Sequence, residues 1–509
     1  MSSTGLPSEN HSVFDRLTLE ELYQEVREIY LSTALPWVIG YSGGKDSTAT
    51  VQMVWLALSQ LPREELNWPV YMIASDTLVE TPVIVDHLTD TLSMMNDKAA
   101  EANLPFEAHK VVPQTTDTFW VNLIGRGYPA PNQRFRWCTE RMKIQPANKF
   151  ILDRAAEFGE VVMVLGGRKS ESASRAQVMN NEDNKITGSR LTRHHVLSRA
   201  YVYTPIEDFT TDDVWTYLLQ VPNPWGGNNR DLAAMYQSAQ SGECPLVVDD
   251  TTPSCGNSRF GCWTCTVVTR DKSMEAMIDS GEEWMEPMLE YRNWLAETQD
   301  PTKKHLYRTH KRRTGQVLVI GKGHDDRTLR GQKNIDLYIK ETGEKLQEGM
   351  IVRGPYEFSF RKEMLRRLLK TQNEVQAEGP DAEQLLITDD ELHEIRRLWR
   401  TEENDWEDSV PQIVKEETGK KLAWLQDDIG AFSAQEFRVL DTICEKNEMP
   451  VKLVADLLEQ ERQMQGMHRR SGIIQRLESV LGEEWRDEET IRQAYNLPFL
   501  FETDEEEIQ

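Results

Sequence analysis

The first part of the chain alternates short apolar runs with longer amphipathic stretches. The apolar runs predict strands and lie at 37–40, 69–74, 106–112 and 161–165. Apolar residues at helical spacing lie before, between and after them, over 14–33, 49–58, 82–103 and 211–220. The last run is apolar almost throughout, as is typical of parallel strands buried on both faces. This alternation predicts an α/β fold with a doubly wound, mostly parallel sheet.

The rest of the chain changes character twice. Residues 223–266 are loop-rich and hold four of the six cysteines. Residues 300–360 carry many basic side chains, and 361–498 have a helical pattern rich in Glu, Leu and Gln. A chain of 509 residues is too long for one ordinary core. We therefore expect three consecutive domains. These are an α/β domain over 14–222, a cysteine-rich loop region over 223–300, and a basic segment with a helical C-terminal extension over 301–509.

The composition is that of an acidic globular protein. Hydrophobic residues make up 39% and the formal net charge is -26. This charge argues against non-specific binding of nucleic acid, although a local basic stripe can still bind it. The sequence has no apolar run of membrane-spanning length and no apolar signal-peptide core at its start. We expect a cytoplasmic protein, in which cysteines serve as metal ligands or reactive thiols more often than as disulfides.

The segment after the first predicted strand has the character of a phosphate-binding loop. It reads YSGGKDST and leads directly into a helix. Two glycines allow a tight turn, and the free N–H groups at a helix start attract an anion. The spacing is not that of the Walker A loop. The candidate pyrophosphate-binding residues are Ser42, Gly43, Gly44, Lys45, Asp46, Ser47 and Thr48.

Two further motifs follow later strands of the same predicted sheet. Asp76, in SDTLVETP at 75–82, can position a nucleotide or a metal ion, or belong to the cap of the next helix. The stretch GGRKSESASR at 166–175 offers arginines for phosphate oxygens and a glutamate to orient one of them. Its candidates are Gly167, Arg168, Glu171 and Arg175.

Four cysteines, Cys244, Cys255, Cys262 and Cys265, lie in the loop-rich region. Four thiolates close in sequence can hold zinc or an iron–sulfur cluster. A zinc ribbon would usually show two tight pairs, whereas this stretch has one C-x-x-C pair and two single cysteines. The spacing therefore favours a [4Fe–4S] cluster, with zinc as the alternative.

Cys138 stands apart, within RFRWCTERMK at 134–143. Basic neighbours should lower the pKa of its thiol, which predicts a persulfide carrier or a substrate-facing thiol. The alternative is a buried cysteine beside phosphate-binding residues. Arg141 and Lys143 are expected to reach the nucleotide or the substrate phosphate from a helix. Cys444 lies on an apolar helical face and is expected in the core.

Basic runs offer contacts for a polyanion. The densest is 303–313, and a second lies at 361–370. Such runs can neutralise the phosphates of a duplex without reading its bases. The other interpretation is a solvated surface or a face for an acidic partner.

Taken together, these motifs resemble those of the PP-loop ATP pyrophosphatases, and among them the PAPS reductase branch. The matching stretches are SGGKDST, SDTLVETP, GGRKSES and the DVWTYL that begins at Asp213. The resemblance implies an adenine nucleotide alpha hydrolase-like fold and cleavage of ATP between the α and β phosphates. Two departures are Leu78, where the branch has glycine, and Cys138, where it has two adjacent cysteines.

The cysteine loop and the long C-terminal part are similar to those of a DNA sulfur modification family within that superfamily. This implies an ATP pyrophosphatase that adenylates a DNA backbone phosphate for sulfur insertion. The implied cofactors are ATP, Mg²⁺ and a [4Fe–4S] cluster. The implied partners are DNA, a cysteine desulfurase as sulfur donor and other modification proteins. No association with a membrane is expected. In this interpretation the catalytic residues are Lys45, Asp46, Arg168 and Cys138.

Three other functions share parts of the pattern. A reductase of phosphoadenylyl sulfate has the same core, but such enzymes are usually much shorter. A tRNA-thiolating enzyme also combines a PP-loop with a cluster, but the GGRKSES stretch favours the reductase branch. A non-catalytic scaffold between a cysteine desulfurase and DNA would not need the intact SGGKDS loop.

Overall fold

The chain forms two compact units, each built from separate stretches of sequence. The computed structural model describes residues 12–133, 135–171, 176–177, 190–194, 196–239, 261–319, 350–421, 434–464, 472–495 and 497. The first unit comprises Met1–Gln114, Cys138–Cys265 and Arg270–Leu289, and the second Thr115–Trp137, Thr266–Thr269 and Glu290–Gln509. This division differs from the three consecutive domains expected from the sequence. Cys262 and Cys265 belong to the first unit, whereas 115–137 belongs to the second unit with the C-terminal helices.

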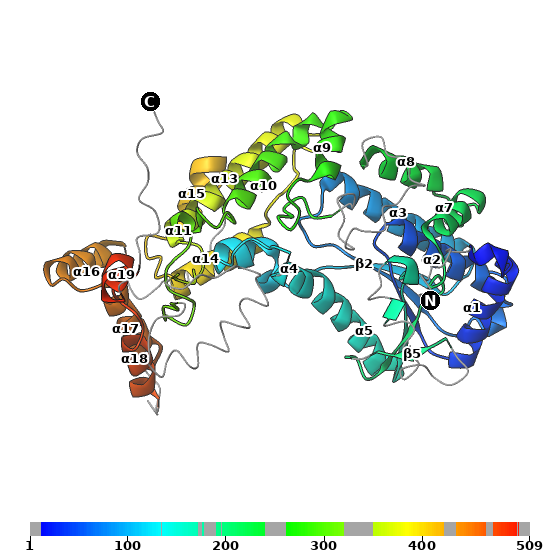
Figure 1. Ribbon diagram of the computed structural model, residues 1–509, viewed down its shortest axis with the longest axis horizontal. Helices are drawn as coiled ribbons and strands as arrows, with labels where there is room; N and C mark the ends of the chain where they lie inside the picture. The colour runs from blue at the N-terminus through cyan, green and yellow to red at the C-terminus, as the bar shows by residue number, and fades with distance from the viewer. Residues whose placement is uncertain are drawn as a thin grey trace, which may run out of the picture. The chain divides into compact units, whose positions relative to one another are not determined.

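A six-stranded sheet forms the centre of the first unit (Figure 1). Its order is β3-β2-β1-β4-β6-β5, and all neighbours are parallel except β5 and β6. The strands are β1 Trp37–Gly40, β2 Val70–Ser75, β3 Phe106–Val111, β4 Val161–Val164, β5 Thr192–Arg193 and β6 Ala200–Tyr203. The predicted fold class and its four strands are confirmed. The sequence did not predict β5 or β6, which are short and only partly buried.

Helices cover both faces of this sheet. One core joins α1 Leu19–Thr33, α2 Lys45–Leu58, α3 Pro82–Glu101, α7 Thr211–Gln220 and α8 Asn229–Ala239 to the strands. A second core lies under α5 Gln145–Phe158 on the opposite face. Neighbouring residues of β1 face opposite cores, because Ile39 belongs to the first and Val38 to the second. This explains why the strands are apolar without alternation.

The helix boundaries follow local capping chemistry. The first helix was expected over 14–33 but begins at Leu19, because Thr18 and Glu21 form a capping box and Val13–Asp15 makes a separate 3₁₀ turn. The helix predicted at 211–220 has those limits and starts with the Thr210–Asp213 capping box. The prediction of loop for 223–266 was wrong in part, since α8 lies within it.

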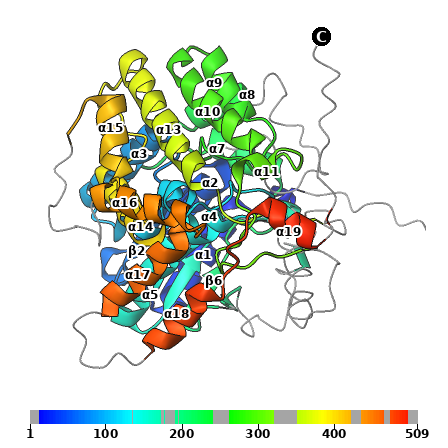
Figure 2. The same ribbon diagram turned by 90° about the vertical axis from the view of Figure 1, so that its left-hand side faces the viewer.

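The described part of the second unit is predominantly helical, in agreement with the predicted C-terminal extension. Its main helices are α13 Phe358–Glu378, α14 Asp389–Glu402, α15 Ser409–Thr418, α16 Ala434–Lys446, α17 Val451–Met464, α18 Ile473–Leu481 and α19 Glu488–Ala494. Figure 2 shows α16, α17 and α18 side by side. Of the helices that the structure describes, none is long and apolar enough to cross a membrane.

The stretch 115–137 forms part of the core of the second unit. Its π-helix η4, Val121–Gly125, is fully buried. The indole of Trp399 donates to the carbonyl of Ile124 at 3.0 Å, and the guanidinium of Arg361 donates to that of Gly125 at 2.7 Å. The indole of Trp120 donates to the carbonyl of Leu386 at 2.6 Å. The first two contacts give hydrogen-bond donors to backbone carbonyls of the irregular π-helix. All three join a segment between β3 and α5 to residues far along the chain.

Candidate active site

The predicted phosphate-binding loop joins the central strand β1 to α2. The chain passes from β1 to β2 and β3 on one side and to β4 on the other, so the strand order reverses at this point. Ligands of open α/β sheets bind at such a switch point, outside the carboxyl ends of the strands. Gly43 has φ +73°, a left-handed conformation that other residues rarely adopt. Because α2 begins at Lys45, its first N–H groups face this loop.

The serines of the loop hold its shape. The amide of Ser42 donates to Ser47 Oγ at 3.2 Å, and the two hydroxyl oxygens are 3.1 Å apart. The Ser47 hydroxyl donates in turn to the carbonyl of Gly44 at 2.9 Å. Ser47 and Thr48 are buried, whereas Ser42 is exposed. Of the three, Ser42 is therefore the one whose hydroxyl is open to a ligand.

Asp46 lies between two cations. Lys45 Nζ is 2.9 Å from one carboxylate oxygen, and Arg168 Nε donates to the other at 2.7 Å. Arg168 is only 4% exposed and also donates to Ser170 Oγ and Thr211 Oγ1. Arg168 thus connects the motif after β4, through Asp46, to the phosphate-binding loop at residues 42–48, which is called the PP-loop below. This geometry fits a positioning role better than the predicted direct clamp on phosphate.

The other residues of the third motif are only partly described. Gly167 lies between β4 and the 3₁₀ turn Lys169–Glu171. Glu171 approaches Arg168 Nε to 3.9 Å, in a position from which it can orient that arginine. Arg175 lies outside the described residues.

Asp76 ends β2 and is 5% exposed. Its carboxylate accepts the amide of Leu78 at 2.8 Å and pairs with Lys110 Nζ at 3.2 Å. It does not cap α3, whose N-cap is Thr81. Leu78 has φ +63°, which costs about 1–2 kcal/mol for a residue with a side chain. The residue that replaces the glycine of the reductase branch is therefore strained, as is frequent at functional sites.

The C-x-x-C pair folds against the loop that follows β2. Glu80 and Cys262 form an isolated antiparallel bridge, and the amide of Trp263 donates to the carbonyl of Val79 at 2.9 Å. The hydroxyl of Thr77 lies 3.3 Å from Cys262 Sγ and donates to Glu80 Oε1 at 3.0 Å. The loop that begins with Asp76 thus ends against a cysteine.

The structure brings Cys138 to the same place. Cys138 lies in the helical turn α4, Trp137–Thr139, close enough to Cys262 and Cys265 for their charges to interact. Lys143, on the π-helix Glu140–Ile144, pairs with Glu80 Oε1 at 3.2 Å. Arg141 lies half-buried on that π-helix. Two cysteine motifs that are far apart in the sequence therefore form one cluster of thiols, here called the thiol cluster (Cys138, Cys262 and Cys265).

The expected low pKa of Cys138 was wrong. Burial raises the pKa of this thiol, and the neighbouring Cys265 raises it further, while Thr139 and Lys143 lower it less. Burial and Glu80 likewise raise the pKa of Cys262, against the influence of Lys143. The charges of Cys262 and Glu80 raise the pKa of Lys143 despite its burial, so this side chain remains an ammonium ion. Basic residues near in sequence do not outweigh desolvation.

The donor set suits a thiophilic centre. Cysteine sulfur favours zinc or an iron–sulfur cluster, and metal binding removes the thiol protons that burial otherwise retains. As the side chains stand, no three His, Cys, Asp or Glu of the described ranges have the geometry of a metal site. Cys244 and Cys255 lie outside those ranges. A [4Fe–4S] cluster therefore remains a proposal, for which Cys138, Cys262 and Cys265 are candidate ligands.

The basic runs are largely paired within the second unit. Arg308 is buried and donates to the carbonyls of Arg353 and Gly354 at 2.8 and 2.7 Å. Lys311 lies 4.1 Å above the ring of Trp485, and Arg313 pairs with Glu402 at 3.3 Å. In the second run, Arg361, Lys362 and Arg366 also pair with carboxylates. These contacts weaken the expectation of an electrostatic stripe for DNA.

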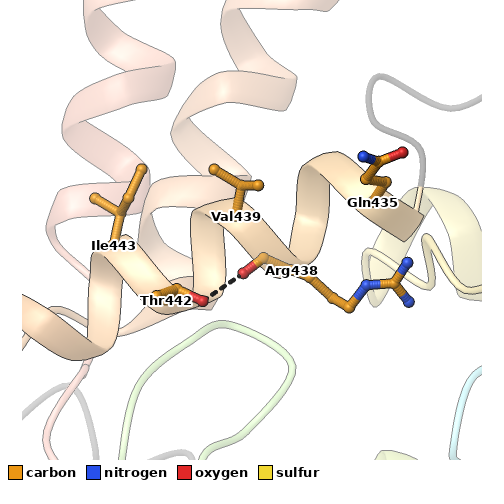
Figure 3. Close-up of a pocket in the computed structure, with 5 residues that line it drawn as sticks. All are labelled: Gln435, Arg438, Val439, Thr442 and Ile443. Carbon is orange, nitrogen blue, oxygen red and sulfur yellow. Dashed lines mark hydrogen bonds between the residues drawn. The ribbon is translucent and has the colours of Figure 1, made fainter.

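A shallow hollow lies on the second unit but carries none of the predicted site residues. One helix, α16, contributes all its lining side chains: Gln435, Arg438, Val439, Thr442 and Ile443 (Figure 3). The hydroxyl of Thr442 donates to the carbonyl of Arg438 at 2.8 Å, and in Figure 3 Val439 and Ile443 point away from these two residues. Nothing in it suggests catalytic chemistry.

Three contributors to the site were not selected from the sequence. Glu80 belongs to a recognised motif, but its contact with Cys262 required the fold. Lys110 lies in β3 and has no motif around it. Tyr236 of α8 accepts the amide N–H of Lys45 at 3.2 Å, and its sequence position gave no signal of this contact.

The mostly parallel sheet carries the SGGKDST loop at its switch point, which is the arrangement expected of a PP-loop domain. Residues 36–268 match the phosphoadenosine phosphosulfate reductase domain family, which covers just under half of the chain. This stretch includes the PP-loop and the C-x-x-C pair. This part of the chain is therefore similar to the PAPS reductase domain family.

Known proteins are similar over parts of the chain. An uncharacterized protein of Methanocaldococcus jannaschii is 26% identical over 200 residues, which are 39% of this chain and 35% of that protein. The chain thus spans about a third of that relative's length. Among solved structures, a tRNA thiolase of Methanococcus maripaludis with its [4Fe–4S] cluster is 14% identical, with a TM-score of 0.26 over 44% of this chain and 72% of that one. An NAD⁺ synthetase of Burkholderia pseudomallei has the same identity and TM-score, over 44% and 85%.

Proposed function

We propose that this chain is an ATP pyrophosphatase that activates a DNA backbone phosphate for sulfur insertion, as DndC does in DNA phosphorothioate modification. One observation carries the proposal. The loop after β2 starts with Asp76 at the nucleotide end of the sheet and ends with Glu80 bridged to Cys262. In this proposal, a site for an adenylated intermediate and a site for sulfur chemistry share this short loop.

The nucleotide half of this proposal follows from charge. The PP-loop amides and Lys45 would bind the β,γ-pyrophosphate of ATP, and Mg²⁺ would neutralise it further. A non-bridging oxygen of the DNA phosphate attacks the α-phosphorus, and pyrophosphate leaves. Sulfide then attacks the DNA phosphorus, so that a P–S bond forms as the P–O bond to AMP breaks and AMP leaves with that oxygen. Persulfide sulfur from the desulfurase would first need two electrons, which a thiol such as cysteine can supply. Asp46, fixed between Lys45 and Arg168, keeps the lysine aligned with the loop.

The sulfur half rests on the thiol cluster. We assign Cys138 to the ligand set beside Cys262 and Cys265, with Cys244 and Cys255 as further candidates. A [4Fe–4S] cluster held there would supply sulfur or electrons, and zinc would make the site structural. Lys143, held by Glu80, lies near the thiols and in this proposal balances negative charge on sulfur, in place of the nucleotide contact expected from the sequence.

The partners of the proposal come from the resemblance. They are DNA, a cysteine desulfurase as sulfur donor and other Dnd proteins, in the cytoplasm. Because the basic runs are largely paired, any DNA contact through them would rely on exposed members such as Lys303.

The reaction can be tested by following ATP with the anaerobically purified full-length chain. The proposal predicts AMP and pyrophosphate in equal amounts, with DNA stimulating the rate. Lys45→Met should lower this rate by about 10²–10³-fold, because it removes a charge placed at the leaving group. Lys98→Met is the matched control, since Lys98 is exposed on α3 and its ammonium group pairs with Glu101 at 2.7 Å.

Other products would point elsewhere. ADP and phosphate would contradict α–β cleavage, and no turnover by a folded chain would support the scaffold. Replacing DNA by tRNA or by phosphoadenylyl sulfate in the same assay separates the thiolase and reductase alternatives.

A further inference from the structure

A tyrosine from α8 lies over the PP-loop. The amide N–H of Lys45, the first residue of α2, donates to the hydroxyl oxygen of Tyr236 at 3.2 Å. A Cβ atom added to Gly44 would lie 3.0 Å from the same oxygen. The Lys45 ammonium group is 5.6 Å from the centre of the Tyr236 ring. The phenol thus occupies space directly beside the N–H groups that a PP-loop offers to an anion.

Packing holds this tyrosine in place. Its ring meets Trp215 of α7 edge to face, with centroids 5.3 Å apart. The start of α8 is anchored by the buried Asn229, whose amide donates to Gln52 Oε1 at 2.9 Å and to the carbonyl of Leu218 at 2.8 Å. Gln52 lies on α2, the helix that the PP-loop begins. The phenol is therefore positioned by the same helices that form the nucleotide end of the sheet.

We infer that the Tyr236 hydroxyl holds the place of a phosphate oxygen in the pyrophosphate site and is exchanged for that oxygen when the nucleotide binds. The inference rests on the proposed function. A phosphate oxygen is charged and makes a stronger hydrogen bond with the Lys45 amide than a neutral phenol does. One N–H cannot serve both acceptors at full strength, so binding of the anion requires loss of the Lys45–Tyr236 bond. Tyr236 therefore lowers the affinity for every anion that takes this N–H.

The variant Tyr236→Phe tests this exchange, because it removes the hydroxyl and keeps the ring against Trp215. Calorimetric titration of the full-length chain should give tighter binding of both inorganic pyrophosphate and Mg·ATP, by about three- to tenfold. The gain should be similar for the two ligands, because both compete for the same N–H. Tyr201→Phe is the matched control. Tyr201 lies on β6, and its hydroxyl bonds to Glu160 at 3.1 Å, away from the PP-loop.

The outcomes separate this inference from the proposed function. Unchanged or weaker binding by Tyr236→Phe, with wild type and Tyr201→Phe binding normally, overturns the exchange and leaves the ATP site standing. Failure of all three proteins to bind pyrophosphate or ATP, at unchanged melting temperature, overturns both. Tyr236→Leu, which also removes the ring, must shift affinity in the same direction as Tyr236→Phe if the hydroxyl is the competing group.

Discussion

The PP-loop follows β1, and the loop after the neighbouring strand β2 ends at the thiol cluster. The two regions differ in how their charges are balanced. At the PP-loop, Asp46 lies between Lys45 and Arg168, so these charged side chains are held in place by one another before a ligand binds. At the thiol cluster, burial raises the pKa of Cys138 and Cys262, Glu80 raises that of Cys262 further, and Lys143 compensates only in part. In the proposed account, the first region is preorganised for an anion, whereas in the second a metal would take the place of the thiol protons.

The largest expected effect is on the thiol cluster. Cys262→Ser should abolish metal binding, because it removes a ligand at the point where the cysteine segment meets the loop after β2. Iron and acid-labile sulfide assays of the anaerobic protein should fall from about four irons per chain to near none. Cys444→Ser is the matched control, since Cys444 is also buried but lies on α16. Equal iron in the two variants would remove Cys262 from the ligand set.

The next effect breaks the charge balance of the PP-loop. Asp46→Asn leaves Arg168, 4% exposed, without its closest carboxylate. Loss of one partner of such a pair should cost about 3 kcal/mol of unfolding free energy. Pyrophosphate release from ATP should also fall, because Lys45 loses its anchor. Asp97→Asn on the exposed side of α3 should change neither quantity. Denaturant unfolding that gave the same stability for both variants would show that Arg168 does not depend on Asp46.

The smallest effect tests the loop after β2, which ends at the thiol cluster. Leu78 has φ +63°, so Leu78→Gly should relieve strain and change the unfolding free energy by less than about 1 kcal/mol. Leu78→Val should destabilise by about 1–2 kcal/mol, because a β-branched residue suits this conformation least. Chemical denaturation of the pair measures the difference. If glycine were the more harmful of the two, the left-handed conformation at this position would be excluded.

The two regions also differ in what the sequence could predict. The PP-loop is one continuous segment between a strand and a helix, so its candidates and its place at the end of β1 followed from local pattern. The thiol cluster joins segments more than a hundred residues apart, and nothing in the sequence placed Cys138 beside the C-x-x-C pair. Its thiol pKa was misjudged because basic neighbours are visible in a sequence and burial is not.

The same limit applies to Arg168 and to the basic runs. Arg168 was correctly placed near the PP-loop by its motif. Its partner Asp46, and therefore its positioning role, emerged only from the packing of β4 beside β1. The residues at 303–313 have the composition of a polyanion site, but Arg308 and Arg313 bond to groups distant in sequence. Charge density along a chain does not show which charges are already paired.

The central claim is that nucleotide activation and sulfur chemistry belong to one site. The most direct measurement supplies the anaerobic chain with ATP, DNA, cysteine, a cysteine desulfurase and the other modification proteins, and analyses the digested DNA by mass spectrometry. The account predicts phosphorothioate-linked dinucleotides in step with AMP, both absent with Lys45→Met and the dinucleotides absent with Cys262→Ser. AMP release without any sulfur in the DNA, from a chain with its metal site filled and the full set of modification proteins present, would contradict it.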